Sequence, residues 1–208
     1  YVMPPIGLGY LAAALRRGGF DEVVILDCVK EGLSFNGFRG FLERIKPRIV
    51  GFQIFSYDFD SVVKSIEIVK QLNHETKVLI GGAHVSATSA LALEEIKQAD
   101  YGFVGEGEIG LPMLAGRLLR DEQIPLENIP GLIWRENSSI RENARTGVED
   151  LDSLGFQPWD LMPPASYPDN PQGGFYKRFP IAPISTTRGC PYLCTFCGSG
   201  VNMGHKLR

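Results

Sequence analysis

Residues 77–87 read KVLIGGAHVSA, and this segment indicates the fold more clearly than any other part of the chain. Its first five residues form a short apolar run, which is typical of a strand covered on both faces within a parallel sheet. Two glycines and small polar residues follow at once, and glycine lets a ligand approach the backbone closely. Because ligands bind at the carboxyl ends of parallel strands, residues 81–87 are a candidate binding segment.

Three further apolar runs predict that this strand is one of several in the same sheet. They are Glu22–Asp27, Arg48–Phe55 and Tyr101–Val104. Stretches of helical periodicity lie beside them, over residues 8–17, 35–46, 61–72, 89–98 and 111–120. This alternation predicts the α/β class, here a doubly wound, Rossmann-like parallel sheet with helices on both faces.

The beginning of the chain lacks the strand with which such a sheet usually opens. The sequence starts at Tyr1, and Pro4-Pro5 leads almost directly into the first predicted helix. We therefore expect an opening strand upstream, and we interpret the chain as an internal piece of a longer protein.

The first predicted domain covers residues 1–146 and ends in a small appendage. Residues 131–136 and 140–143 flank a polar turn, which is typical of a β-hairpin.

A proline-rich connection, residues 147–180, follows the first domain. Seven of the 14 prolines fall within residues 151–183. The connection carries four large apolar side chains that we expect to be partly buried on a surface, Trp159, Leu161, Phe175 and Tyr176. Residues 181–187 then predict the first strand of a second domain, of which only residues 181–208 are present.

Composition places the chain among ordinary globular proteins. Its 208 residues are 44% hydrophobic and 22% charged, which argues against disorder, a collagen-like repeat or a coiled coil. No apolar run is long enough to predict a transmembrane helix. The net charge of -3 gives no sign of a nucleic-acid or anionic-membrane partner, so we expect a cytoplasmic protein.

The cysteines are unevenly distributed along the chain. Cys28 stands alone, whereas Cys190, Cys194 and Cys197 have the spacing C-x3-C-x2-C in a loop after a predicted strand. Three thiolates on one short loop can hold a four-iron cluster that keeps one iron open for chemistry. The alternative is a structural zinc site completed by His205, and a disulfide would leave one thiol unpaired.

The sequence RGCPYLCTFC, residues 188–197, resembles the radical S-adenosylmethionine (SAM) superfamily. That family has this cysteine spacing with an aromatic residue before the last cysteine, and Phe196 fits. The resemblance implies a four-iron four-sulfur cluster on the three cysteines, whose open iron binds SAM. It also implies reductive cleavage of SAM to a 5'-deoxyadenosyl radical, with the backbone beside Phe196 contacting adenine.

Residues 4–160 resemble the cobalamin-binding domain that precedes the radical SAM barrel in one large subgroup, which includes the anaerobic magnesium-protoporphyrin monomethyl ester cyclases. The matching segments are PPIGLGYLAA (4–13), GGAHVSA (81–87), GEGE (105–108), DLD (150–152) and PWD (158–160). The D-x-H-x-x-G motif of methionine-synthase-type cobalamin domains is absent, and residues 56–60 read SYDFD instead. The resemblance therefore implies cobalamin without identifying a lower ligand to cobalt.

The cobalamin contacts implied by the resemblance lie after the predicted strands. They are Ser56, Gly81, Gly82, His84, Val85, Ser86, Gly105, Glu106, Gly107 and Glu108. His84 either ligates cobalt or hydrogen-bonds a neighbouring loop or the corrin periphery. The two glutamates either accept hydrogen bonds from the cofactor or cap the helix that begins near Gly110. Cys28 and His74 are interpreted as structural or surface residues.

The resemblance implies a cobalamin-dependent radical SAM enzyme that methylates, cyclises or rearranges an unactivated carbon. Its partners would be a small-molecule, natural-product or tetrapyrrole-like substrate and an electron donor such as flavodoxin or ferredoxin. Because the barrel stops one strand and a loop after it starts, we expect the fragment alone to be inactive. The alternatives are a non-catalytic α/β module with structural zinc, and a radical SAM enzyme whose sheet binds a partner instead of cobalamin.

Overall fold

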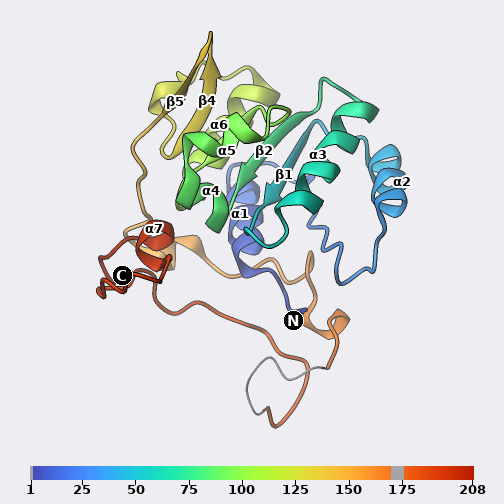
Figure 1. The fold of residues 1–208 in the computed structure, drawn as a ribbon. Helices are drawn as coiled ribbons and strands as arrows, with labels where there is room; N and C mark the ends of the chain where they lie inside the picture. Colours follow the sequence, from blue (N-terminus) through green and yellow to red (C-terminus); the bar gives the residue numbers. More distant parts are fainter. Residues whose placement is uncertain (1, 170–175) are drawn as a thin grey trace.

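The computed structural model describes residues 2–169 and 176–208, and these residues form one mixed sheet with helices packed around it (Figure 1). The sheet consists of β1 (Ile49–Gln53), β2 (Lys77–Gly81), β3 (Tyr101–Phe103), β4 (Leu132–Glu136) and β5 (Ser139–Glu142), in that spatial order. β1, β2 and β3 are parallel, with Val50 opposite Val78 and Leu79 opposite Tyr101. β4 and β5 are antiparallel and form the predicted hairpin.

Helices cover both faces of this sheet, which confirms the α/β fold class. The helices are α1 (Ile6–Arg17), α2 (Phe35–Ile45), α3 (Phe59–Leu72), α4 (Ala83–Thr88), α5 (Ala90–Glu95), α6 (Gly110–Arg120) and α7 (Ser199–Met203). The core on one face contains residues of α2 to α5, and the core on the other contains residues of α6. α1 packs beside α6.

The position of β2 explains its unbroken apolar sequence. Successive side chains of a strand point to opposite faces, so Val78 and Ile80 join the core beneath α2 to α5, whereas Leu79 joins the core beneath α6. All three side chains are at most 4% exposed. A strand buried on both faces has no polar side, as residues 77–81 predict.

Two predicted strands are absent from the sheet. Residues 22–27 are not a strand, because their backbone finds no strand partner among the described residues, although Leu26 packs on the core. Val24 is 57% exposed. Residues 181–187 likewise have no neighbouring strand to pair with in the described chain, so the predicted opening strand of a second domain is not formed.

The helix predicted over residues 89–98 is also different in the structure. Helix begins earlier, at Ala83, directly after Gly82, and it is broken at Ser89, whose φ is +52°. An L-residue with positive φ cannot continue a right-handed helix, so α4 and α5 are separate.

The proline-rich connection packs against α1. Asp160 accepts two hydrogen bonds from the Arg16 guanidinium, at 2.9 and 2.7 Å. Met162 and Tyr167 are buried, and Trp159 and Leu161 are partly buried. Tyr176 is exposed, contrary to expectation, and Phe175 lies outside the described residues.

None of the described helices is long and apolar enough to cross a membrane.

We expect the Gly82→Ala substitution to destabilise the fold. Gly82 has φ +99°, and a Cβ there would lie 2.9 Å from the carbonyl oxygen and 3.0 Å from the amide nitrogen of Ile54. The free energy of unfolding should fall by about 2 kcal/mol or more, because both backbone strain and a clash are introduced. Urea unfolding followed by circular dichroism measures this difference.

Gly40→Ala is the matched control for this substitution. Gly40 lies in α2, and a Cβ there would meet nothing within 4 Å. Alanine is a better helix former, so this variant should be more stable by about 0.5–1 kcal/mol. If both variants lost the same free energy of unfolding, the close approach of Gly82 to the Ile54 backbone would not be what position 82 requires.

Candidate functional site

The carboxyl ends of β1, β2 and β3 meet at one edge of the sheet and bring several predicted site residues together. Ser56 follows β1, and His84 lies in the first turn of α4 after β2. The hydroxyl oxygen of Ser56 is 3.0 Å from His84 Nδ1. The His84 ring also packs on the Phe59 ring, with centroids 4.9 Å apart. His84 is therefore hydrogen-bonded to the loop that follows β1.

The other nitrogen of His84 is buried and has no hydrogen-bond partner among the described residues. Nε2 lies 3.9 Å from a carboxylate oxygen of Glu95, which is too far for a hydrogen bond. One ring nitrogen is therefore occupied by Ser56 and the other faces α5. The ring as oriented presents no nitrogen to an open ligand space.

Three glycines shape this edge of the sheet. Gly82 approaches the Ile54 backbone, and the Gly81 carbonyl accepts a 2.8 Å hydrogen bond from the Ile54 amide. Gly105 has φ +78°, and its amide donates to the Ser86 hydroxyl at 3.0 Å. Ser86 is buried and holds the loop after β3 in place, and Val85 is a core residue with no exposed surface.

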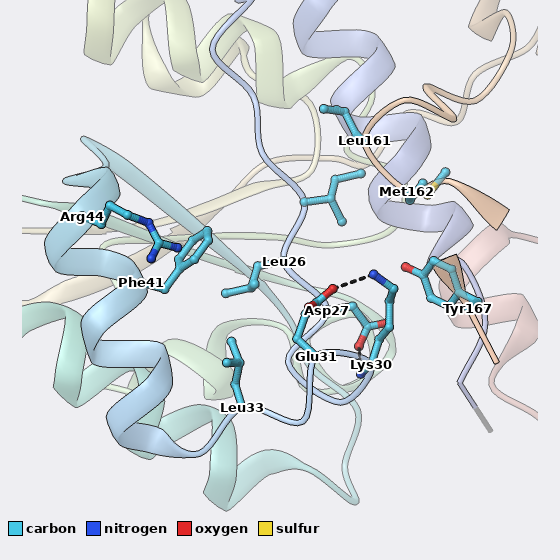
Figure 2. Close-up of a pocket in the computed structure, with 11 residues that line it drawn as sticks. Leu26, Asp27, Lys30, Glu31, Leu33, Phe41, Arg44, Leu161, Met162 and Tyr167 are labelled. Atoms are coloured by element: carbon cyan, nitrogen blue, oxygen red, sulfur yellow. Dashed lines mark hydrogen bonds and ion pairs between the residues drawn. The ribbon is translucent and has the colours of Figure 1, made fainter. Parts of the chain in front are cut away.

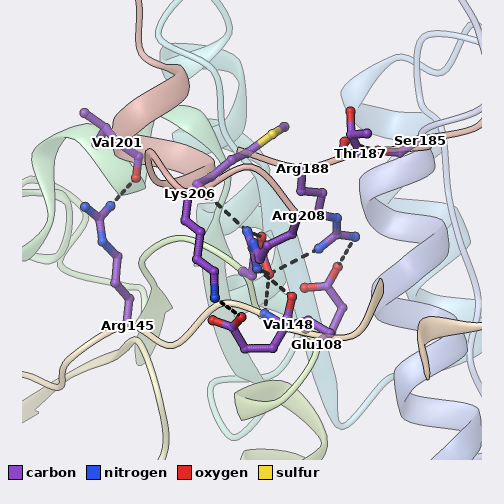
Figure 3. Close-up of polar contacts among 12 residues, drawn as sticks. Glu108, Arg145, Val148, Ser185, Thr187, Arg188, Val201, Lys206 and Arg208 are labelled. Carbon is purple, nitrogen blue, oxygen red and sulfur yellow. Dashed lines mark hydrogen bonds and ion pairs between the residues drawn. The ribbon is translucent and has the colours of Figure 1, made fainter. Parts of the chain in front are cut away.

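Glu106 and Glu108 bind arginines from the far end of the chain (Figure 3). The Arg188 guanidinium donates to Glu108 at 2.7 Å, and Arg208 donates to both carboxylate oxygens of Glu106. The four side chains are 6–9% exposed. The helix-capping alternative is wrong, because α6 begins at Gly110 with no side-chain cap. The carbonyl of Gly107 accepts the first α6 hydrogen bond, from Leu111.

The surroundings of Glu106 favour its ionised form. Burial by itself would raise the pKa of Glu106, but hydrogen bonds from Arg208 and the Val148 amide, with the charge of Arg188, lower it below its ordinary value. The hydrogen bond between Arg208 and Glu106 also raises the pKa of Arg208. The carboxylate is therefore charged at neutral pH, and both of its oxygens accept hydrogen bonds from the protein.

Arg188 and Arg208 are site residues that the sequence analysis missed. The Arg188 guanidinium lies 4.8 Å from the Tyr10 ring centroid, so α1 also contributes to the site. The backbones of the two arginines exchange hydrogen bonds of 3.1 and 2.8 Å. They close the base of the segment that carries the three cysteines, residues 188–208, here called the cysteine loop. The position of Arg188 beside the cysteine motif could have marked it as a site residue. Only the fold shows that its partner is Glu108.

The three cysteines of this loop are free thiols. Cys190 is partly buried, and its amide donates to the Gly204 carbonyl at 3.1 Å. Cys194 and Cys197 are exposed and joined by a 3.1 Å backbone hydrogen bond. Hydrogen bonds from Ser199 lower the pKa of the Cys197 thiol. Phe196, between them in sequence, is 91% exposed.

The donor chemistry of the cysteine loop suits an iron–sulfur cluster, since three unpaired thiols lie on one short, solvent-facing segment. Their side chains are not gathered, because residues 2–169 and 176–208 contain no group of three or more His, Cys, Asp or Glu side chains placed to hold a metal ion. His205 directs Nδ1 to the Cys190 carbonyl oxygen at 3.2 Å. This contact helps to hold the loop and leaves Nε2 of His205 available to a ligand.

Residues 1–115 match the family model for the B12 binding domain. The chain belongs to this family. A protein of Pyrococcus horikoshii described as an uncharacterized methyltransferase is 32% identical over 209 residues, covering 99% of this chain and 42% of that protein. The anaerobic magnesium-protoporphyrin IX monomethyl ester cyclase of Rubrivivax gelatinosus is 27% identical over 201 residues, covering 93% of this chain and 34% of the cyclase. The chain thus spans less than half the length of these relatives.

Solved structures show the same fold. The radical S-adenosylmethionine methyltransferase TsrM from Kitasatospora setae, solved with cobalamin and a 4Fe–4S cluster bound, superimposes with a TM-score of 0.68 at 20% identity. The match covers 99% of this chain and 40% of TsrM. OxsB, a cobalamin-dependent S-adenosylmethionine radical enzyme, gives a TM-score of 0.59 at 18% identity, covering 68% of this chain and 20% of OxsB.

A separate pocket of about 300 Å³ lies beside α2 (Figure 2). It is lined by six residues between Ile25 and Leu33, by Phe41 and Arg44 of α2, and by side chains of the proline-rich connection. Tyr167 closes one side of the pocket, and the Lys30 ammonium lies 5.1 Å from the centroid of the Tyr167 ring. None of the predicted cofactor contacts lines this pocket.

The environment of Tyr167 predicts a loss of stability in alkali. Burial, with the charges of Asp27 and Glu31, raises the pKa of Tyr167 to about 12. In the unfolded chain the tyrosine hydroxyl loses its proton near pH 10. The stability that protonated Tyr167 gives to the folded protein is therefore full below pH 10 and is lost as pH rises toward 12. The free energy of unfolding should fall by up to about 3 kcal/mol over this window. Urea unfolding at a series of pH values measures it.

Tyr167→Phe is the control, because it removes the titrating hydroxyl and keeps the ring. Wild type should lose stability relative to this variant between pH 10 and 12. Parallel pH profiles for the two proteins would show that Tyr167 does not titrate as stated.

Proposed function

We propose that this chain is the cobalamin-binding and cluster-binding part of a cobalamin-dependent radical SAM enzyme. The observation that carries the proposal is the place of the cysteine loop, which is held by ion pairs at the carboxyl edge of a B12-family sheet. This edge is where open parallel sheets bind ligands. Relatives named as methyltransferases and as cyclases support the general class.

Cys190, Cys194 and Cys197 are the proposed ligands of a four-iron four-sulfur cluster. Two of the thiols are exposed and can turn toward a common metal centre without disturbing the core. Phe196 is free to pack beside SAM through its ring or neighbouring backbone. Together with SAM, the cluster would supply a radical able to activate an unreactive carbon.

Cobalamin is the proposed ligand of the sheet edge beside the cysteine loop. Ser56 supplies a hydroxyl there, and the match of residues 1–115 to the B12 binding domain supports a corrin as the ligand. His84 is assigned a positioning role through Ser56, since one ring nitrogen faces that hydroxyl and the other is buried. The chain would bind and orient the corrin and exclude water from the space between the cofactors.

Methyl transfer to a small-molecule substrate is the reaction we propose, with cyclisation as the alternative outcome. The relative from Pyrococcus horikoshii and the cytidylyl-2-hydroxyethylphosphonate methyltransferase of Streptomyces wedmorensis are both named as methyltransferases. The latter is 28% identical over 250 residues. A natural-product or tetrapyrrole-like substrate and an electron donor of the flavodoxin or ferredoxin type complete the proposal.

Anaerobic iron–sulfur reconstitution of the full-length protein tests this assignment. We expect about four irons per chain and one bound cobalamin, measured by metal analysis and absorption spectra. Cys190→Ala, Cys194→Ala and Cys197→Ala should each lose the intact cluster and the release of 5'-deoxyadenosine from SAM. Cobalamin should still bind to these variants, because its proposed contacts lie elsewhere.

Cys28→Ala is the matched control for the cysteine variants. Cys28 packs on the hydrophobic core, and burial raises the pKa of its thiol, so its loss should leave the iron content unchanged. One zinc per chain with neither iron nor corrinoid would overturn the proposal in favour of a non-catalytic module.

A further inference from the structure

We propose that Glu106 and Glu108 are positioning residues that dock the cysteine loop onto the sheet, instead of contacts to the corrin. This inference deepens the proposed function and rests on it for the identity of the cofactors. It concerns the GEGE segment, residues 105–108, which follows β3, and the two arginines that close the cysteine loop.

Glu106 is already bound by three hydrogen bonds from the protein. One carboxylate oxygen accepts from the Val148 amide at 2.7 Å and from Arg208 at 3.1 Å, and it lies 3.5 Å from Arg188. The other oxygen accepts a second hydrogen bond from Arg208. The side chain is only 8% exposed. A paired arginine and carboxylate in this forked arrangement fix both distance and orientation.

Glu108 fixes the opposite end of the loop base. It accepts a 2.7 Å hydrogen bond from Arg188, and both side chains are less than 10% exposed. The Arg188 guanidinium is also held against the Tyr10 ring of α1. Because Arg188 lies two residues before Cys190, the start of the cysteine loop is tied to both β3 and α1.

The loop base transmits this anchoring to the cysteines. Residues 188 and 208 exchange two backbone hydrogen bonds, and the Cys190 amide binds the Gly204 carbonyl just inside them. Gly189 has φ +89°, and a Cβ there would lie 2.0 Å from the Lys206 carbonyl oxygen. The two segments of the loop base are therefore too close for any side chain at position 189.

Charge balance makes the docking specific. Two carboxylates and two guanidiniums are buried together, so the cluster is neutral as a whole (Figure 3). Removing one charge leaves its partner buried and unpaired, which is far more costly than losing an exposed pair. The loop base is thus held to one position by the GEGE segment.

Hydrogen–deuterium exchange on the full-length protein tests the docking, with Glu106→Gln and Glu108→Gln. Both variants keep the side-chain shape and remove one negative charge. We expect peptides within residues 188–208 to exchange about tenfold faster or more. The dissociation constant for hydroxocobalamin, followed by absorption, should stay within about twofold of wild type, since the corrin contacts are separate.

Glu149→Gln is the matched control. Glu149 pairs with Lys206 of the same loop, but the two side chains are 68% and 71% exposed. Hydrogen–deuterium exchange of residues 188–208 should therefore be the same in Glu149→Gln as in wild type. Arg188→Lys and Arg208→Lys keep the charge and lose the forked hydrogen bonds, and we expect an intermediate increase in exchange. These conservative variants also decide the matter if a glutamine variant fails to fold.

The opposite pattern would overturn the inference. If Glu106→Gln or Glu108→Gln weakens cobalamin binding more than about tenfold while loop exchange stays at the wild-type rate, the glutamates are corrin contacts. Equal acceleration in Glu149→Gln would equally refute a specific docking role. If the wild-type protein binds no cobalamin, the proposed function fails. The exchange experiment alone then decides whether Glu106 and Glu108 hold the cysteine loop on the sheet.

Discussion

Burial of β2 on both faces is the constraint on which the rest of the structure depends. Val78, Leu79 and Ile80 have almost no contact with solvent, so their backbone groups must find partners inside the protein. β1 and β3 supply those partners as parallel neighbours. Parallel pairing places the carboxyl ends of all three strands at one edge, and the loops that follow them form the candidate site.

A second constraint is electrostatic and acts at that edge. The carboxylates after β3 are buried, and a buried charge is stable only when it is paired and hydrogen-bonded. Arg188 and Arg208, some 80 to 100 residues further along the chain, supply the pairing. The same contacts that make buried glutamates tolerable also bring the cysteine loop to the sheet, so stability and site assembly depend on one network.

The site divides into two parts with different exposure. Ser56 and His84 form an ordered polar contact backed by Phe59. The tip of the cysteine loop is open, and Tyr192, Leu193 and Phe196 are 73–91% exposed in the described chain. Apolar side chains so exposed beside free thiols are typical of a surface that another part of a protein or a ligand covers.

The sequence by itself determined the α/β class, the strands around residues 49–53, 77–81 and 101–103, the hairpin and the cysteine loop, because periodicity and cysteine spacing are local properties. It failed for residues 22–27 and 181–187, since a strand exists only where a neighbour can pair with it. The partners of Glu106 and Glu108 were likewise decided by tertiary structure. Ion pairs between distant segments depend on which surfaces meet after folding, and no local pattern encodes that.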